Sequence, residues 1–117
     1  MSTVHSVEAF VPARDYALSQ RFYADQGFEQ TSDSHGVSYF VHGQCRFLLQ
    51  DFHHPQLAEN LMLHLLVSDV AARHSQPQAI AERHAVQLGP LIEQPWGMLD
   101  CCLHDPCGVL WRIGQNR

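Results

Sequence analysis

Histidine and cysteine are the side chains in this sequence that chemistry could most readily use. The chain has nine histidines and four cysteines. No HExxH motif is present, and the cysteines lack the paired spacing of zinc fingers, so no local metal motif is indicated. The adjacent Cys101 and Cys102 would point to opposite faces of a strand, and we interpret them as packing residues. No nucleophile-elbow motif indicates a serine nucleophile.

The charged residues exclude several classes of function. All seven basic residues are arginines, and there is no lysine. Schiff-base chemistry through a side chain, attachment of pyridoxal phosphate and a P-loop are therefore excluded. Twelve acidic residues give a formal net charge of −5, which argues against nucleic-acid partners and against a polybasic membrane surface.

Length and composition indicate one globular unit. The chain has 117 residues, of which 45% are hydrophobic, enough to bury a core without disulfides or metals. We expect a single domain over residues 1–117. The first residues do not resemble a signal peptide, and no apolar run reaches membrane-spanning length. We therefore expect a cytoplasmic protein with reduced thiols and no membrane partner.

The first half of the chain alternates between strand-like and helix-like patterns. Residues 4–11 alternate like a strand, and Asp15 is a candidate N-cap for a helix over 16–26 that would end at Gly27. The next apolar runs indicate three further strands, over residues 28–32, 37–41 and 45–50. Residues 51–60 have no periodicity and are interpreted as a linker.

The second half repeats this order. Residues 61–67 indicate a strand, followed by a short turn over 69–74 and a helix over 77–85 that Ser75 would cap. The remaining strands are expected at a weak segment between Pro90 and Pro95, at 98–104, and at 109–113, with a tight turn at 105–108.

The repeated order βαβββ, linker, βαβββ predicts an α+β fold built from two modules, over residues 4–50 and 61–114. Each module is too small to fold well alone. We expect their strands to form one curved mixed sheet, with helices on one face and a concave cavity on the other. A homodimer is expected, and the pattern leaves open whether its halves are swapped between chains or lie side by side.

Two segments of the chain carry a family resemblance. The first combines VPARD at 11–15 with RFYADQGF at 21–28, and the second combines EQPWG at 93–97 with DPCGVLWRIG at 105–114. Together they resemble the vicinal oxygen chelate superfamily of glyoxalases, bleomycin-resistance proteins and dioxygenases. The EQPWG run is most similar to the bleomycin-resistance branch. These motifs mark the fold, which hosts many reactions and also pure binders.

The resemblance also implies where a metal would bind, namely at inward-facing His or Glu residues on strands of both modules. The first such position matches Glu8, or His5 if the strand is gapped, and His64 is its counterpart in the second module. The C-terminal ligand position matches Arg112, whose side chain cannot bind a cation. We therefore expect no metal cofactor. If a divalent ion is bound, Glu8, His64 and His5 are its candidate ligands.

The cavity wall is instead expected to hold a polar cluster of Glu8, His64 and Arg112, because a buried carboxylate needs a partner such as arginine. Trp96 at a strand entry could stack on a planar ligand, or seal the sheet edge or the dimer contact. Four more side chains are expected to line the cavity: Phe10, Leu66, Met98 and Asp100.

The resemblance implies a non-catalytic protein that binds and sequesters a small molecule in a cleft between two subunits, as in antibiotic resistance. The alternative is a metal-dependent lyase, isomerase or dioxygenase of the same superfamily, with a carboxylate such as Glu8 as base or ligand. A third reading, a partner-binding subunit with a vestigial cavity, also remains open.

Overall fold

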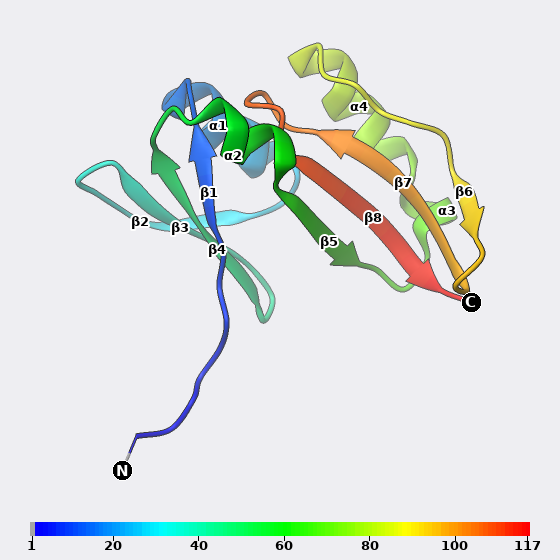
Figure 1. The fold of residues 1–117 in the computed structure, drawn as a ribbon. Coiled ribbons are helices and arrows are strands. Elements are labelled where there is room, and N and C mark those ends of the chain that lie inside the picture. Colours follow the sequence, from blue (N-terminus) through cyan, green and yellow to red (C-terminus); the bar gives the residue numbers. More distant parts are fainter. Residues whose placement is uncertain (1) are drawn as a thin grey trace.

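The computed structural model describes residues 2–117 and divides into two similar halves (Figure 1). The first half comprises β1 (Phe10–Ala13), α1 (Tyr16–Asp25), β2 (Glu29–Ser34), β3 (Val37–His42) and β4 (Cys45–Asp51). The helix α2 (Pro55–Asn60) connects it to the second half. The second half comprises β5 (Met62–Leu66), α3 (Val70–Arg73), α4 (Ser75–His84), β6 (Ile92–Gln94), β7 (Met98–His104) and β8 (Leu110–Asn116).

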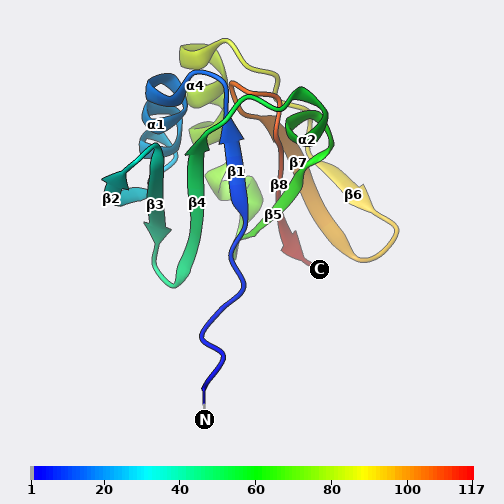
Figure 2. The same cartoon turned by 60° about the vertical axis from the view of Figure 1, so that its left-hand side comes forward.

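Each half forms its own four-stranded mixed sheet. The strand orders are β1-β4-β3-β2 and β5-β8-β7-β6, so the second half repeats the topology of the first. In each sheet the first strand pairs in parallel with the last, and the other pairs are antiparallel. The two sheets stand beside each other with their edge strands β1 and β5 adjacent (Figure 2). The expected α+β class and two-module arrangement are confirmed.

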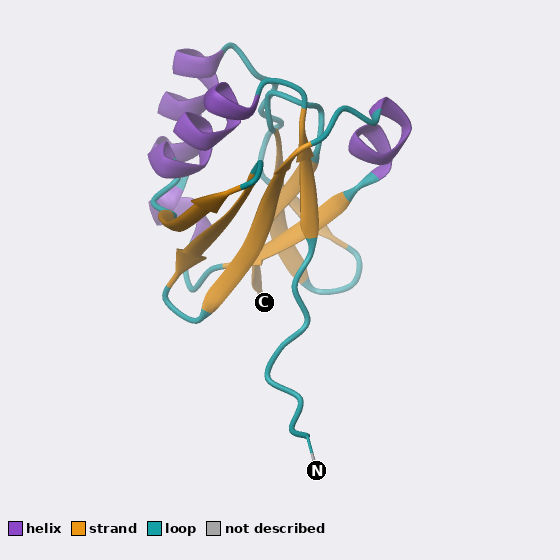
Figure 3. Ribbon diagram, turned by 90° about the vertical axis from the view of Figure 1, so that its left-hand side faces the viewer, coloured by secondary structure: helices purple, strands orange, loops and turns teal. Residues whose placement is uncertain are grey.

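The helices lie mainly on one side of the strands (Figure 3). Helix α1 packs against β2 and β4, α3 packs against β8, and α1 and α4 touch each other across the two halves. The short helix α2 stands apart on the other side, against β1. No helix within residues 2–117 is long and apolar enough to span a membrane.

Helix α1 begins and ends where the sequence predicts. The carboxylate of Asp15 accepts a hydrogen bond from the Leu18 amide at 3.2 Å, which satisfies one of the free N–H groups of the first turn. Gly27 follows the last turn with φ of +95°, a conformation that glycine adopts without strain.

The aromatic core joins the two halves. The Tyr23 ring from α1 lies 4.8 Å from the Phe47 ring of β4 and 5.6 Å from the Trp111 ring of β8, centroid to centroid. These separations are typical of favourable edge-on and tilted aromatic pairs. Phe28 and Phe40 complete the cluster, and all five side chains are buried.

A buried carboxylate ties this core to the predicted tight turn at 105–108. Asp105 accepts hydrogen bonds from the amides of Cys107 and Val109 and from the Tyr23 hydroxyl, which in turn accepts one from the Trp111 indole N–H. Burial raises the pKa of Asp105, while these hydrogen bonds act to lower it. The turn of the second half is thereby anchored to the helix of the first.

Three local expectations were wrong. The first strand begins at Phe10, although the Ala9 carbonyl just before it accepts a hydrogen bond from the Leu48 amide of β4 at 2.9 Å. Residues 4–9 are exposed except for half-buried Glu8 and Ala9. The expected linker contains α2, whose N-cap is His54 with Pro55 in the first turn. Ser75 does not cap the second helix: it lies within α4, because α3 and α4 follow each other almost without interruption and His74 between them is helical.

The contact between α1 and α4 predicts a pH-dependent contribution to stability. The His84 Nε2–H donates to Asp25 at 2.7 Å, and Arg83 lies 3.1 Å from the same carboxylate. The hydrogen bond from His84 is the main cause that lowers the pKa of Asp25. The contribution of this contact to the free energy of unfolding is therefore complete above the unfolded-state pKa of Asp25. It is lost as pH falls through the lower folded-state pKa of the same group.

We expect Asp25→Asn to lower the free energy of unfolding by about 1 kcal/mol at pH 7, the usual scale of a partly exposed charged contact. Urea denaturation at several pH values checks this, with Glu82→Gln, an exposed acid on the same helix as His84, as control. The difference in stability between Asp25→Asn and the unmodified protein should begin to narrow below about pH 3.8 and close as pH falls through the lower folded-state pKa of Asp25. A gap of constant size would contradict the assignment.

Candidate functional site

One face of the second sheet points away from the shared core, and we call it the outer face. Strand alternation places His64 on this face, between the half-buried Leu63 and Leu65 that pack against the core. Cross-strand register sets His64 beside Arg112, and Arg112 beside Cys102. The outer face also carries several large apolar side chains: Met62, Leu66, Ile92 and Met98.

An ion pair lies in the middle of this face. Arg112 Nη2 is 3.2 Å from Asp100 Oδ2, and the Gln94 side-chain amide donates to Asp100 Oδ1 at 3.0 Å. Asp100 is only 2% exposed. A carboxylate this deeply buried needs a charged partner, so Arg112 is fixed in place and the pair presents little net charge.

Trp96 covers this ion pair. It lies in the turn between β6 and β7, and the Arg112 guanidinium carbon is 5.4 Å from the centre of its ring, a cation–π geometry. The ring is nevertheless 61% exposed. With Arg112 beside one part of the ring, the indole keeps surface available for stacking against a planar molecule.

Gly114 on β8 makes room for the ion pair. A Cβ atom at this position would lie 2.9 Å from the Asp100 Cβ and 3.1 Å from the Leu99 carbonyl oxygen, closer than a side chain can approach. The Asp100–Arg112 pairing was not predicted from the sequence, which assigned Glu8 to Arg112. The signal that could have found it is the hairpin register around the turn at 105–108, which brings Asp100 and Arg112 onto the same face.

Glu8 lies elsewhere. The Ser6 hydroxyl donates to its carboxylate at 2.5 Å, and Arg46 Nε from β4 is 3.4 Å away. These contacts, the Ser6 hydrogen bond foremost, lower the pKa of Glu8. The expected cluster of Glu8, His64 and Arg112 therefore does not form within one chain, since Glu8 pairs with Arg46 of the first sheet and Arg112 pairs with Asp100.

The residues expected to hold a divalent metal are not brought together within the described chain. Within residues 2–117 no three His, Cys, Asp or Glu side chains come close enough to share an ion. His64, the second-module candidate, neighbours Arg112 on β8, whose guanidinium has no lone pair with which to bind a cation. His5 is exposed in the N-terminal segment and pairs with no strand.

The first sheet has a comparable open face. Register aligns Phe10 of β1 with Leu48 of β4, and Leu48 with Tyr39 of β3. Leu48 and Tyr39 are half-buried, and Phe10 is 53% exposed. Arg46 and Glu8 lie next to this row. Each sheet thus presents an amphipathic face to solvent, with an aromatic residue on each.

A cavity of about 380 Å³ opens between the two sheets, where the N-terminal segment passes β5. Its walls are mainly apolar and include Val7 and Ala9 on one side and Leu63 and Leu65 on the other, with Trp111 among them. His64 and Leu66 also line it, so it is continuous with the outer face. This volume is within the range of small-molecule sites.

Six of the eight proposed ligand-binding residues lie together in the second module: five on the outer face and Trp96 in the adjoining turn. The five on the face are His64, Leu66, Met98, Asp100 and Arg112. The remaining two, Glu8 and Phe10, lie at the open face of the first sheet.

No family model matches the chain, and no curated protein sequence matches it either. Solved structures do match the fold over nearly the whole chain. A bleomycin-binding protein complexed with bleomycin is 22% identical, with a TM-score of 0.80 over 97% of this chain and 100% of its own.

Two further solved structures share the fold. An antibiotic-binding protein from a Streptomyces species is 23% identical, with a TM-score of 0.78 over the full length of both chains. A lactoylglutathione lyase from Agrobacterium tumefaciens is 18% identical, with a TM-score of 0.71 over 97% of this chain and 95% of its own. The resemblance inferred from the sequence motifs is confirmed at the level of the fold: the chain has the α+β fold of the glyoxalase and bleomycin-resistance proteins.

Proposed function

We propose that this protein binds a planar small molecule on the outer face and sequesters it without catalysis. The observation that carries the proposal is the exposed indole of Trp96, held over the Asp100–Arg112 pair. An immobilised aromatic ring beside apolar side chains is suited to stacking and loses little entropy on binding. Two neighbours of the same fold are described as binding bleomycin and an antibiotic, which supports the same class of ligand.

We propose further that the ligand cleft forms between two copies of the chain. Several large apolar side chains are exposed on the open faces of both sheets, namely Phe10, Met62, Leu66 and Ile92. Contiguous apolar surface of this kind marks an interaction site. The open face of the first sheet in one copy would pack against the outer face of the other copy. In a closed two-fold dimer this contact occurs twice, so the apolar surface of both copies would be covered.

The N-terminal segment is the second support for a dimer. Val7 is 97% exposed and Val4 is 87% exposed, although both are β-branched and apolar. Edge strand β5 has backbone groups free on its outer side. We propose that residues 2–9 extend along the partner chain and bury these valines there.

Removal of residues 2–8 is therefore expected to convert a dimer of about 27 kDa, twice the chain mass of 13.3 kDa, into a monomer. Sedimentation velocity at about 50 µM checks this, with the substitution of Val4 and Val7 by serine as a milder variant. A full-length chain that sediments at 13.3 kDa, or a truncated chain that remains dimeric, would contradict this role for the segment.

The binding proposal is tested by titration with two probes, metal-free bleomycin and the planar cation 9-aminoacridine, followed by calorimetry. Trp96→Leu should weaken the binding of the effective probe about tenfold or more, because stacking on an aromatic side chain contributes about 1–3 kcal/mol. Phe52→Leu, an exposed aromatic residue beyond the end of β4, is the control for a general effect of losing an aromatic side chain. Equal affinities for Trp96→Leu and the unmodified protein would contradict the proposal.

The lyase neighbour motivates one alternative, a metal-dependent lyase, isomerase or dioxygenase. Its test is incubation of the Mn-, Ni- and Zn-supplemented protein with the methylglyoxal–glutathione adduct and with catechol. Turnover that His64→Ala abolishes would favour the enzyme over the binding protein.

A further inference from the structure

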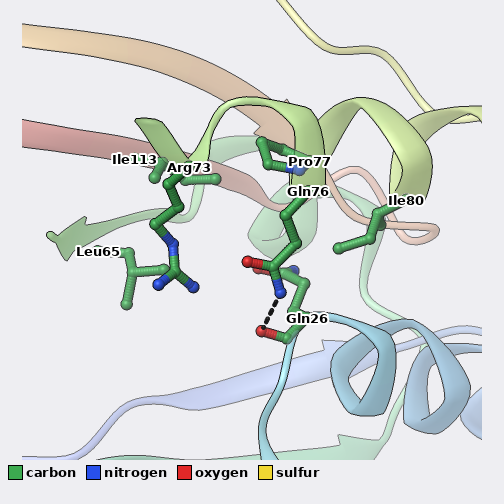
Figure 4. A pocket seen from close by; sticks show the side chains of 7 residues that line it. All are labelled: Gln26, Leu65, Arg73, Gln76, Pro77, Ile80 and Ile113. Atoms are coloured by element: carbon green, nitrogen blue, oxygen red, sulfur yellow. Dashed lines mark hydrogen bonds between the residues drawn. The ribbon is translucent and has the colours of Figure 1, made fainter. Parts of the chain in front are cut away.

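A narrow cavity lies on the seam between the two halves, on the helix side and away from the outer face. Figure 4 shows Gln76 from α4 directed toward Gln26, which follows α1, and Arg73 from α3 extending beside Leu65 along the same cavity. Leu65 and Ile113 of the second sheet, with Pro77 and Ile80 of α4, form the apolar remainder. The enclosed space is about 10 Å³, room for about one oxygen atom.

Arg73 enters this cavity without a carboxylate partner. It is half-buried, yet no Asp or Glu oxygen within residues 2–117 lies within 4.0 Å of it, whereas four other arginines are paired. An arginine at a cavity wall with no carboxylate beside it favours a negatively charged group from outside the chain.

The two glutamines add donors to the same space. Gln26 is 5% exposed, and its Nε2 group is buried with no hydrogen-bond partner. The Gln76 Nε2–H donates to the backbone carbonyl oxygen of Gln26 at 3.4 Å, so this carbonyl already has a hydrogen-bond partner. A buried amide without a partner costs about 1–3 kcal/mol, so an acceptor from outside the chain that reached Gln26 Nε2 would be stabilised there.

A second cavity of about 180 Å³ adjoins this one, and Leu65 and Arg73 line both. Its other walls combine the apolar Leu66 and Val67 with polar groups from the β3–β4 hairpin and Ser68. The seam thus offers a place for a negatively charged oxygen atom next to space for a small apolar group.

We propose that this seam is a second binding site, which takes the carboxylate of a small organic acid. One carboxylate oxygen fills the narrow cavity between Gln26 and Gln76, and the guanidinium of Arg73 pairs with the carboxylate. The apolar part of the acid occupies the adjoining cavity. The residues that hold the carboxylate lie within one chain and on the helix side, although the adjoining cavity shares Leu66 with the outer face.

The test is a titration of ¹⁵N-labelled protein with sodium benzoate at constant ionic strength, followed by NMR. The side-chain amide signals of Gln26 and Gln76 should shift and saturate. Arg73→Gln should weaken binding about tenfold or more, and Arg73→Lys by less, because it keeps the charge and loses the planar fork. Arg21→Gln, an exposed arginine on α1 with no carboxylate partner, is the matched control. Trp96→Leu should leave benzoate binding unchanged.

Benzyl alcohol is the control for the aromatic ring, because it has the ring of benzoate but no carboxylate. Binding of benzyl alcohol as tight as that of benzoate would overturn the proposal, as would shifts that grow linearly with benzoate. Equal affinity of Arg73→Gln and the unmodified protein would also overturn it. If Arg73→Gln fails to fold, Gln76→Ala serves in its place, and its amide spectrum in the absence of ligand verifies the fold.

Discussion

Asp105→Ala is expected to lower the free energy of unfolding by about 3–5 kcal/mol. The substitution leaves the Tyr23 hydroxyl and the amides of Cys107 and Val109 without their acceptor inside the core. Each buried polar group that loses its partner costs about 1–3 kcal/mol. Because the carboxylate joins α1 of one half to the turn of the other, we expect both halves to lose stability together.

Thermal denaturation and urea denaturation measure this effect, and the melting temperature should fall by about 10–20 °C. Asp105→Asn is the matched control. Its side-chain oxygen can still accept from the two amides, so it should cost less than half as much. A change below about 1 kcal/mol for Asp105→Ala would show that Asp105 does not anchor the turn.

Arg112→Met should have the second large effect, on stability and on ligand binding together. It leaves the Asp100 carboxylate, 2% exposed, with the Gln94 amide as its remaining hydrogen-bond donor. Loss of one partner of a buried ion pair costs about 3–5 kcal/mol. Trp96 also loses the guanidinium that holds its ring in place.

The double variant Asp100→Asn/Arg112→Met separates these two effects. It removes the uncompensated charge, so most of the stability should return, while the binding of a planar ligand should remain weak. Urea denaturation and calorimetry on the same preparations check both. If stability does not recover in the double variant, the cost of Arg112→Met arises from lost packing rather than from the buried Asp100.

The elements that the sequence predicted well are those specified by local chemistry. Asp15 and Gly27 bound α1 because a cap and a left-handed residue act over a few neighbouring positions. The strand at 98–104 and the turn at 105–108 were likewise predicted at their observed positions, since alternation and turn residues determine them.

The features that the sequence did not predict depend on distant partners. Residues 4–9 alternate like a strand, but alternation does not tell whether a neighbouring strand extends far enough to pair with them. Arg112 was grouped with Glu8 because the family resemblance places both at cavity positions, whereas hairpin register gives it Asp100. The seam cavity also escaped prediction, because Gln26 and Gln76 carry no sequence motif and meet only after the halves pack.

The most direct test of the binding account is a titration of the full-length protein with bleomycin and 9-aminoacridine, followed by tryptophan fluorescence and mass spectrometry of the recovered probe. The account predicts saturable quenching that Trp96→Leu removes, one probe bound per chain, and recovery of that probe with its mass unchanged. Saturable binding that Trp96→Leu leaves intact, the absence of binding by either probe, or a recovered probe of altered mass would contradict it.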